Sequence, residues 1–434
     1  MLLIIAILLS TLLYKAQSES DVSPMMGLPP YPKKPNFIPY FFDVHVRNIV
    51  NNIVSQSVLN TDSEDEDDFY GNFKSKLRLM LEEFKNNTCL QFDETNKPAD
   101  KIGINFFVSD NDKNHVELSR SKNSPTILRL TRKVYEDPFK FRYFFAKALG
   151  LMPEIQRIDR ESELTIFKDS IDESFYKDYE KSTCYYSHFF ESDFDFKSAA
   201  MPIDNLGFRS PSKHPKHNKI YQSYLEPYYE LMLKKGYDFS FSDYRQISYM
   251  YCDFSYEENE CENGGYPYIY KEDSNPECKC PRGYWKDKCQ TIKDFKHQEC
   301  PTPNKITANP NYQEMTLEAR SSNCYINITA SKSTGKVQIY ARKLECNNPY
   351  RCKYNRKIDS IEIKYRDDKG VKGISLFTSQ FKPIELPALS NEVTILWIFG
   401  GNDFTPKFTF QYREVIPESK WPYWMDKSFD KMIQ

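Results

Sequence analysis

Residues 141–160, which read FRYFFAKALGLMPEIQRIDR, place two polar side chains at the spacing that a helix uses to hold a metal ion. Tyr143 and Lys147 are four residues apart, so a helix brings both to one face. Two imidazoles at this spacing, with a third ligand after a turn, form a catalytic zinc site. Here a phenol and an ammonium group occupy the two places, and the segment contains no histidine.

The same segment follows the frame HExxHxxGxxHExxRxDR, which is the active-site motif of a class of zinc proteases. On this frame the three metal-binding histidines fall on Tyr143, Lys147 and Pro153, and the glutamate that serves as general base falls on Phe144. We call these four residues the zinc-motif positions. We predict no catalytic residue, no metal ligand and no cofactor. Zinc would be expected only if the protease activity of this motif were retained. The other letters of the frame are present at Gly150, Glu154, Arg157, Asp159 and Arg160, and Ala148 and Leu149 directly precede Gly150.

No other histidine supplies such a site. The chain has six histidines, none of them lies between residues 116 and 187, and no two are four residues apart. His214 and His217 stand in the run PSKHPKHNK, where the prolines favour a loop. This pair is therefore interpreted as part of a solvated basic loop rather than as a metal site.

The elements that must position residues 141–160 can be predicted from local patterns. Asp137 and Pro138 are typical of a helix start, as the N-cap and the first helical residue, and Gly150 is expected to end that helix. Its apolar stripe is also compatible with a plain core helix. An amphipathic helix is predicted from Phe73 to before Asn86. Strands are predicted over 36–44 and 101–109, and a solvated acidic loop over 61–68.

Composition and termini are typical of a secreted protein. Residues 2–13 are apolar but too short to span a bilayer. We therefore predict a signal peptide at 1–18, followed by a short pro-like or linker segment at 19–35. No later stretch is expected to span a membrane. The net charge of −2 gives no indication of a nucleic-acid partner. The expected location is extracellular.

Eleven cysteines behind a signal peptide are best interpreted as disulfide partners. Only Cys89 and Cys184 precede Cys252, whereas nine cysteines lie within 252–352. This distribution predicts a larger N-terminal domain with its own core, followed by small modules that need covalent staples. The sequons at Asn86 and Asn327 are candidate glycosylation sites in a secreted chain.

Five segments in order, IPYFFD (38–43), NNTCLQF (86–92), ALGLMPEIQRIDRESELTI (148–166), FDFKSAAM (194–201) and FSDYRQISYMYC (241–252), resemble the astacin family of secreted zinc endopeptidases. The likeness is to the nematode type, which carries an EGF-like module and a CUB domain. The resemblance implies an α+β fold with an astacin-like (metzincin) domain at 36–252. An EGF-like module at 257–290, a CUB β-sandwich at 300–415 and a C-terminal tail at 416–434 would follow.

The family pattern also implies a disulfide map. It pairs Cys89–Cys252, Cys261–Cys278, Cys280–Cys289 and Cys300–Cys324, while Cys346 and Cys352 flank a loop short enough to bridge. Cys184 is left over, and a buried free thiol is favoured there over a nucleophile assisted by His188.

The family's Met-turn and the calcium site of some CUB domains give two further comparisons. Met201 or Ala200 takes the methionine place. The tyrosine place, whose side chain reaches zinc in the family, falls on Pro202 or Ile203. In the CUB-like region Asp359, Asp367 and Asp368 could contribute to a calcium site, an interpretation that the pattern does not favour.

Three functions remain open at the level of sequence. The favoured one is a catalytically inactive astacin homologue that binds an extracellular protein through the CUB domain or the degenerate cleft. The alternatives are an active zinc endopeptidase with an atypical site and a structural protein of the extracellular matrix. Zinc binding separates the second function from the others, and a saturable partner separates the first from the third.

Overall fold

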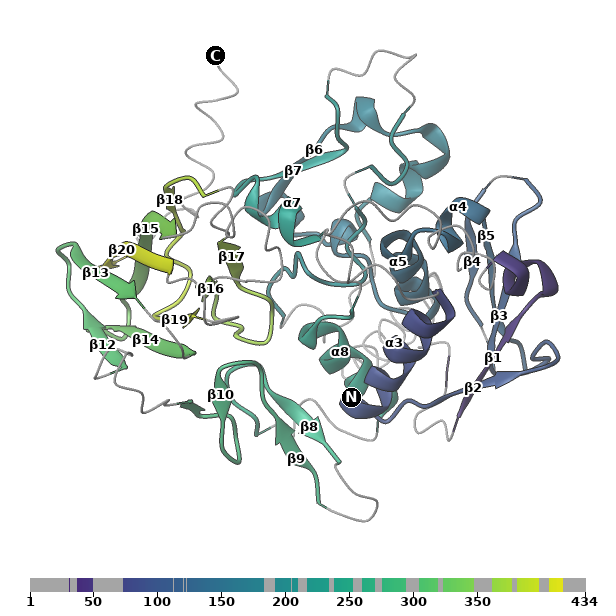
Figure 1. Ribbon diagram of the computed structural model, residues 1–434, viewed down its shortest axis with the longest axis horizontal. Coiled ribbons are helices and arrows are strands. Elements are labelled where there is room, and N and C mark those ends of the chain that lie inside the picture. The colour runs from purple at the N-terminus through teal and green to yellow at the C-terminus, as the bar shows by residue number, and fades with distance from the viewer. Residues whose placement is uncertain are drawn as a thin grey trace, which may run out of the picture.

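The structure, shown in Figure 1, is a computed structural model. The predicted signal peptide, the acidic loop at 61–68 and the tail beyond residue 416 lie outside the residues it describes. It describes residues 31, 37–49, 73–111, 113–119, 121, 123–182, 192–203, 205–209, 217–233, 238–252, 260–269, 275–293, 304–318, 323–346, 361–376, 381–397 and 406–416.

The N-terminal part is built on a five-stranded sheet in the order β2-β1-β3-β5-β4. All neighbours pair in parallel except β4 and β5, which are antiparallel. The predicted strands at 36–44 and 101–109 are confirmed as β1 and β3. The strands are β1 (Ile38–Phe42), β2 (Phe92–Thr95), β3 (Ile104–Val108), β4 (His115–Glu117) and β5 (Thr126–Leu130).

Helices α3 (Phe73–Asn87), α4 (Arg132–Tyr135) and α5 (Pro138–Ala148) lie beside this sheet (Figure 1). Aromatic rings form the contact between them. The ring of Phe106 on β3 lies 5.8 Å from that of Phe141 on α5, and Phe84 on α3 lies 6.1 Å from Phe145. These side chains belong to one buried cluster, so α5 is fixed between the sheet and α3.

The prediction that α3 ends before Asn86 is wrong, because the helix continues to Asn87. The last carbonyls of a helix have no partner within it. Here the carbonyls of Lys85, Asn86 and Asn87 accept hydrogen bonds from a distant segment: from Tyr268 Oη at 3.1 Å, Lys279 Nζ at 2.9 Å and Tyr266 Oη at 2.8 Å. This tertiary cap stabilises a final turn that local sequence does not predict.

The chain after α5 has little regular structure. It forms the short 3-10 helices η1 (Glu154–Gln156), η2 (Arg160–Ser162), η3 (Lys168–Ser170) and η4 (Glu173–Tyr179). Strands β6 (Leu164–Ile166) and β7 (Tyr221–Ser223) pair antiparallel. Helices α7 (Tyr228–Leu233) and α8 (Phe241–Tyr251) follow, and a capping box of Ser240 and Asp243 opens α8.

Two small hairpins make up the described part of residues 260–293, which we call the disulfide module. Strand β8 (Tyr266–Tyr268) pairs with β9 (Glu277–Lys279), and β10 (Tyr284–Trp285) pairs with β11 (Thr291–Ile292).

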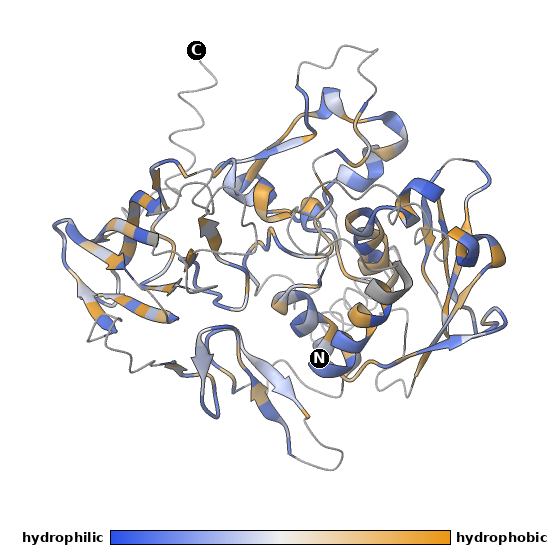
Figure 2. Cartoon of the chain, in the orientation of Figure 1, coloured by the Kyte–Doolittle hydropathy of each residue, from blue (hydrophilic) through white to orange (hydrophobic). Residues whose placement is uncertain are grey.

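The C-terminal part is a β-sandwich, as predicted for 300–415. One sheet has the order β12-β14-β19-β16-β17 and the other β13-β20-β15-β18. Their inner faces share one apolar cluster, and hydrophobic and hydrophilic residues alternate along strands such as β14 and β20 (Figure 2). The strands are β12 (Lys305–Ala308), β13 (Gln313–Glu318), β14 (Cys324–Ala330), β15 (Lys336–Cys346), β16 (Ile361–Lys364), β17 (Ile374–Leu376), β18 (Ile384–Glu385), β19 (Glu392–Trp397) and β20 (Pro406–Val415).

The sandwich does not stand apart from the preceding chain. Its apolar cluster continues into residues such as Phe196, Tyr229 and Met232, so the region after α5 and the sandwich share one core. Helix α7 packs against β17, where the Ser375 amide lies 3.4 Å from Met232 Sδ. The sequence predicted a self-sufficient N-terminal domain, but only the sheet with α3, α5 and α8 has a separate cluster.

Buried polar contacts cross the boundary between this region and the sandwich. Arg366 makes a two-pronged ion pair with Glu163, at 2.8 and 2.5 Å. Arg245 on α8 makes another with Asp368, at 2.8 and 2.5 Å. The hydroxyl groups of Tyr229 and Tyr365 bond to each other. We call these six residues the junction.

Candidate functional site

Helix α5 carries three of the four zinc-motif positions, at residues 143, 144 and 147. Asp137 caps it, with its carboxylate accepting from the amides of Phe139 (3.0 Å) and Lys140 (3.2 Å), and Pro138 is its first residue. Both features confirm the prediction from sequence. Gly150 follows the helix with a φ of 80°, a conformation that glycine adopts without a steric cost. Pro153 then precedes η1 as its N-cap residue.

Tyr143 fills the first position with a buried aromatic ring. The residue is 1% exposed. Its hydroxyl makes no hydrogen bond to any described residue. Burial, followed by the nearby Asp178 carboxylate, raises the pKa of this phenol well above its ordinary range. Catalytic zinc sites take three protein ligands from cysteine, histidine and carboxylate side chains, and this phenol supplies none of these donors at the first histidine position.

Lys147 stands at the second histidine position of the frame, and its ammonium group already has a partner. Its Nζ lies 2.5 Å from Asp178 Oδ1 in η4 and 5.5 Å from the centroid of the Tyr143 ring. Both charged side chains are about a quarter exposed. The Asp178 carboxylate therefore balances the charge of this ammonium group. A protonated lysine held in an ion pair has no lone pair for a metal.

The other two zinc-motif positions, Phe144 and Pro153, carry side chains that have no donor atom for a metal. Phe144 is buried and offers no base to accept a proton from water. Pro153 is buried as well, and its ring carries no metal-binding atom. Within the part of the chain that the structure describes, no three His, Cys, Asp or Glu side chains are grouped so that they could hold a metal. The residues present therefore do not fit the zinc that the frame implies.

The remaining charged residues of the frame hold the chain after α5 in place. Arg157 pairs with both oxygens of Asp159, at 2.8 and 2.7 Å, and donates to the Ser192 carbonyl at 2.9 Å. Arg160 Nη1 donates to the carbonyls of Ile155 (2.5 Å) and Tyr179 (2.6 Å). These bonds explain on structural grounds why the frame can persist without its metal ligands.

The turn at 198–201, predicted to correspond to the Met-turn, is anchored by one buried carboxylate. Asp243 accepts from the Ser198 hydroxyl (2.6 Å), the Ala199 amide (2.7 Å) and the Ser240 amide (2.8 Å). Ala200 and Met201 are both fully buried. The turn is therefore held by a side chain of α8.

Neither candidate for the tyrosine place brings a phenol to this turn. Pro202 uses its carbonyl to accept from Tyr221 Oη at 2.6 Å, and Ile203 is buried among apolar residues. The family's tyrosine position thus carries no metal-binding side chain in either register.

Three titratable groups near this turn have pKa values shifted by burial, which sequence reasoning missed. Burial raises the pKa of Glu154 to about 8, because Arg157 at 3.6 Å is shared with Asp159 and compensates only in part. Burial, with Asp243 nearby, raises the pKa of Asp195 to about 6. Burial, with Arg142 nearby, lowers the pKa of Lys197 to about 7. The Glu154 carboxylate accepts a hydrogen bond from the backbone amide of Asp195 at 3.3 Å, so Glu154 contacts the main chain of this turn.

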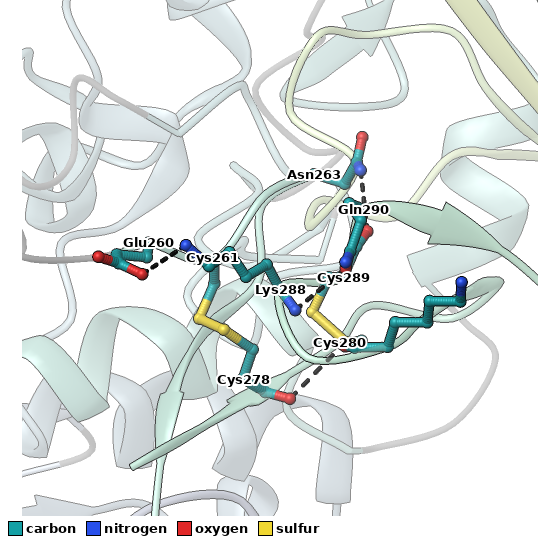
Figure 3. Close-up of a disulfide and its surroundings, with 9 residues drawn as sticks. Glu260, Cys261, Asn263, Cys278, Cys280, Lys288, Cys289 and Gln290 are labelled. Carbon is teal, nitrogen blue, oxygen red and sulfur yellow. Dashed lines mark hydrogen bonds and ion pairs between the residues drawn. A yellow bond between two sulfur atoms is a disulfide. The ribbon is translucent and has the colours of Figure 1, made fainter.

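Three disulfides lie among the described residues: Cys89–Cys252, Cys261–Cys278 and Cys280–Cys289. They are the pairs that the resemblance implied. Figure 3 shows the last two in the disulfide module, where Lys288 also pairs with Glu260 at 2.6 Å. Cys324 is disulfide-bonded as well. The bonds expected for it with Cys300, and for Cys346 with Cys352, lie outside the described residues, as do Cys184 and His188.

The remaining sequence candidates occupy very different surroundings. Asn86 is exposed at the end of α3, whereas Asn327 on β14 is 8% exposed. Asp368 forms the junction ion pair with Arg245, and Asp367 lies 3.4 Å from Lys336 on the surface. Asp368 is therefore already paired, and no three His, Cys, Asp or Glu side chains of the described residues are grouped so that they could hold calcium. Asp359 lies outside the described residues.

Comparison with known proteins gives a family match for the region described above. The profile of the astacin family of peptidases matches residues 63–252. Two curated relatives are named zinc metalloproteinase nas-36, from Brugia malayi and Haemonchus contortus. They are 26% identical over 223 residues and 25% identical over 239 residues. The matches cover 50% and 54% of this chain but only 35% and 36% of the relatives, so the chain spans about a third of their length.

Solved structures give weaker likenesses. High choriolytic enzyme 1, a hatching enzyme zinc-protease from Oryzias latipes, is 16% identical, covers 52% of this chain and 94% of its own, and has a TM-score of 0.36. The CUB1-EGF-CUB2 domain of human MASP-1/3 is 17% identical, covers 37% of this chain and 56% of its own, and has a TM-score of 0.20. The family match therefore depends on sequence. Over the described residues, no helix has the length and hydropathy of a membrane span.

Proposed function

The chain belongs, through residues 63–252, to the astacin family of peptidases, and from this premise we propose that it binds another protein and does not cleave peptides. In this proposal the family fold is kept as a scaffold, while the zinc chemistry has been lost. The observation that supports it most is the state of the zinc-motif positions. Tyr143 is a buried phenol, Phe144 is a buried ring, Lys147 is paired with Asp178, and Pro153 has no donor.

Peptide hydrolysis by this route requires two groups that these positions lack. A bound zinc lowers the pKa of its water toward 7, and a carboxylate accepts the proton as that water attacks. Without imidazoles at 143, 147 and 153 the first requirement fails, and without a glutamate at 144 the second fails. Loss of four groups in one site cannot be compensated by a single neighbouring side chain.

Proteolysis by the secreted full-length chain tests the proposal. We expect no chelator-sensitive cleavage of a protein substrate. The matched control is the fourfold variant Tyr143→His, Phe144→Glu, Lys147→His and Pro153→His, which restores the three histidines and the glutamate of the frame. Each single substitution should leave the chain inactive. Cleavage by the unaltered chain that stops on chelation would contradict the proposal and would assign it the activity for which its relatives are named.

Secretion is the second part of the proposal. Three disulfides among the described residues suit an oxidising compartment. An N-terminal segment predicted to be a signal peptide supports the same location. The expected outcome is recovery of the chain, with its disulfides formed, from the medium of expressing cells.

The third part of the proposal is that the partner is an extracellular protein bound by the sandwich. The outer face of its first sheet is covered by the disulfide module, where Ile292 packs against Tyr325 and Leu396. The second sheet presents polar side chains to solvent instead, among them Glu314 and Arg342, which pair at 2.6 Å. This open polar face is the surface we propose for partner binding.

Crosslinking on the full-length secreted chain tests this part. A saturable partner whose crosslinks fall on β13, β15 and β20 supports it, and charge reversal at Arg342 should then weaken binding. Labelling that never saturates would favour the alternative of a structural matrix protein. Crosslinks around Lys147 would place the partner at the zinc-motif positions instead.

A further inference from the structure

We propose that Asn86 carries an N-linked oligosaccharide and that Asn327 remains unmodified in the folded protein. These are the two places where the chain has the sequon Asn-x-Thr. The sequence alone treats them as equal. The structure separates them by exposure and by what covers each side chain. The inference depends on the proposed secretion, because the sugar is added in the secretory pathway.

The chemistry is the same at both sites. A host transferase uses a lipid-linked oligosaccharide pyrophosphate as the donor. A bond forms between the asparagine Nδ2 and the anomeric carbon of the first sugar, while the bond from that carbon to the pyrophosphate breaks. The amide nitrogen loses one proton, and the lipid pyrophosphate leaves. Transfer takes place on extended chain, so the fold decides which product can reach the native state.

Asn86 can carry the sugar without disturbing the fold. It lies on the last turn of α3, and its side chain is exposed. Its backbone carbonyl accepts from Lys279, whereas no hydrogen bond among the described residues uses its side-chain amide. The third sequon residue, Thr88, is buried and bonds to the Phe84 carbonyl at 2.7 Å, so the neighbouring turn is fixed. A glycan at Asn86 projects from the rim between α3 and the hairpin β8–β9.

Asn327 lies in the middle of a sheet. It is on β14, between β12 and β19, and it faces Lys305 and Thr394 in the register of these strands. Its neighbours Ile326 and Ile328 point into the sandwich core, so alternation directs Asn327 to the opposite face. That face is still not open, because Asn327 is only 8% exposed.

The disulfide module covers this face. Tyr284 on β10 bonds to Thr394 Oγ1 at 2.6 Å, and Thr394 in turn lies 3.5 Å from Asn327 Oδ1. Beside this chain of polar contacts, Ile292, Tyr325 and Leu396 form a small apolar cluster. A sugar on Asn327 would occupy the place of β10 and β11. A chain glycosylated there cannot dock its disulfide module, so it should be missing from the folded secreted population.

Glycopeptide mapping of the full-length chain, expressed with its own N-terminal segment in eukaryotic cells and collected from the medium, tests the inference. Release by peptide-N-glycosidase in heavy-oxygen water converts an occupied asparagine to labelled aspartate. We expect the label at Asn86 and none at Asn327. Asn86→Gln should abolish the mobility shift on deglycosylation. Thr329→Ala, which removes the second sequon but keeps Asn327 and its contact with Thr394, should leave the shift unchanged.

The outcomes distinguish this inference from the proposed secretion. A secreted chain with a bare Asn86, or with a sugar on Asn327, overturns the glycan assignment while leaving secretion intact. A chain that never reaches the medium and carries no sugar contradicts both.

Discussion

The zinc-motif positions and the junction differ in how well their polar side chains are paired. At the junction each buried charge meets its partner twice, as Arg245 does with Asp368 and Arg366 with Glu163. At the zinc-motif positions a buried phenol, Tyr143, has no hydrogen bond to any described residue, and a partly exposed ammonium group pairs with one carboxylate oxygen. The two-pronged ion pairs therefore join parts of the molecule, and the zinc-motif positions contain no such pair among the described residues.

Breaking a junction ion pair should have the largest effect on stability. Asp368→Leu leaves the Arg245 guanidinium buried without a counter-charge, and loss of one partner of a buried pair costs about 3–5 kcal/mol. Unfolding in denaturant measures this loss. The matched control is the adjacent Asp367→Asn, whose partner Lys336 is on the surface, and it should cost about 0–1 kcal/mol. If the substitutions at 367 and 368 lowered the free energy of unfolding equally, the junction ion pair would contribute no more to stability than a surface pair.

Removing the disulfide between the ends of the astacin-like region should cost slightly less. Cys89 and Cys252 are 163 residues apart, and losing a native disulfide typically costs about 2–5 kcal/mol. The double substitution Cys89→Ala and Cys252→Ala should lower the thermal midpoint accordingly. A non-reducing peptide map that instead shows Cys89 bonded to Cys184 would mean that the pairing transferred from the family is wrong.

The buried carboxyls near the turn at 198–201 should make stability depend on pH. Folding raises the pKa of Glu154 from its ordinary 4.5 to about 8 and that of Asp195 from 3.8 to about 6. The folded state then binds more protons than the unfolded state between these values. These two carboxyl groups therefore make stability fall as pH rises from about pH 4 toward pH 8, while Lys197, whose pKa is lowered to about 7 in the folded state, acts in the opposite direction above pH 7.

Glu154→Gln should flatten the part of this fall that lies between about pH 6 and 8, because the amide keeps an acceptor for the Asp195 amide but does not titrate. Denaturant midpoints measured across this range check it. Glu173→Gln, at an exposed position at the start of η4, serves as the control and should leave the slope unchanged. A slope that survives Glu154→Gln would show that other groups cause it.

The smallest effect is expected at Tyr143. Tyr143→Phe removes a buried hydroxyl that has no described partner, so it should leave stability unchanged or raise it by about 1 kcal/mol. Tyr135→Phe is the control, since its hydroxyl donates to the Phe107 carbonyl at 3.0 Å, and its loss should cost about 1 kcal/mol. If Tyr143→Phe lowers stability more than Tyr135→Phe does, the Tyr143 hydroxyl has a stabilising partner that the account above does not include.

Local patterns were sufficient where the cause is local. The cap by Asp137 and Pro138 and the end of α5 near Gly150 follow from backbone preferences of nearby residues, so the sequence predicted them. The end of α3 was missed because Tyr266, Tyr268 and Lys279 supply its last partners from far along the chain. The alternating strands of the sandwich were predicted from their period, but the core they share with α7 was not.

Some features of the candidate site could likewise be predicted from the sequence, and others depend on the tertiary fold. Loss of the three zinc ligands and of the general base is evident from four residues of the sequence, because the ability to bind a metal or accept a proton is a property of the side chain itself. The ion pair between Lys147 and Asp178 joins residues 31 positions apart, and only the tertiary fold brings them together. The raised pKa values of Glu154 and Asp195 likewise depend on burial, which no motif encodes.

Zinc content of the purified secreted chain is the most direct test of the central claim. Metal analysis after dialysis should find no stoichiometric zinc in the unaltered protein, while the fourfold variant Tyr143→His, Phe144→Glu, Lys147→His and Pro153→His provides the matched positive control. One tightly held zinc per unaltered chain, accompanied by proteolysis that a chelator abolishes, would contradict the account.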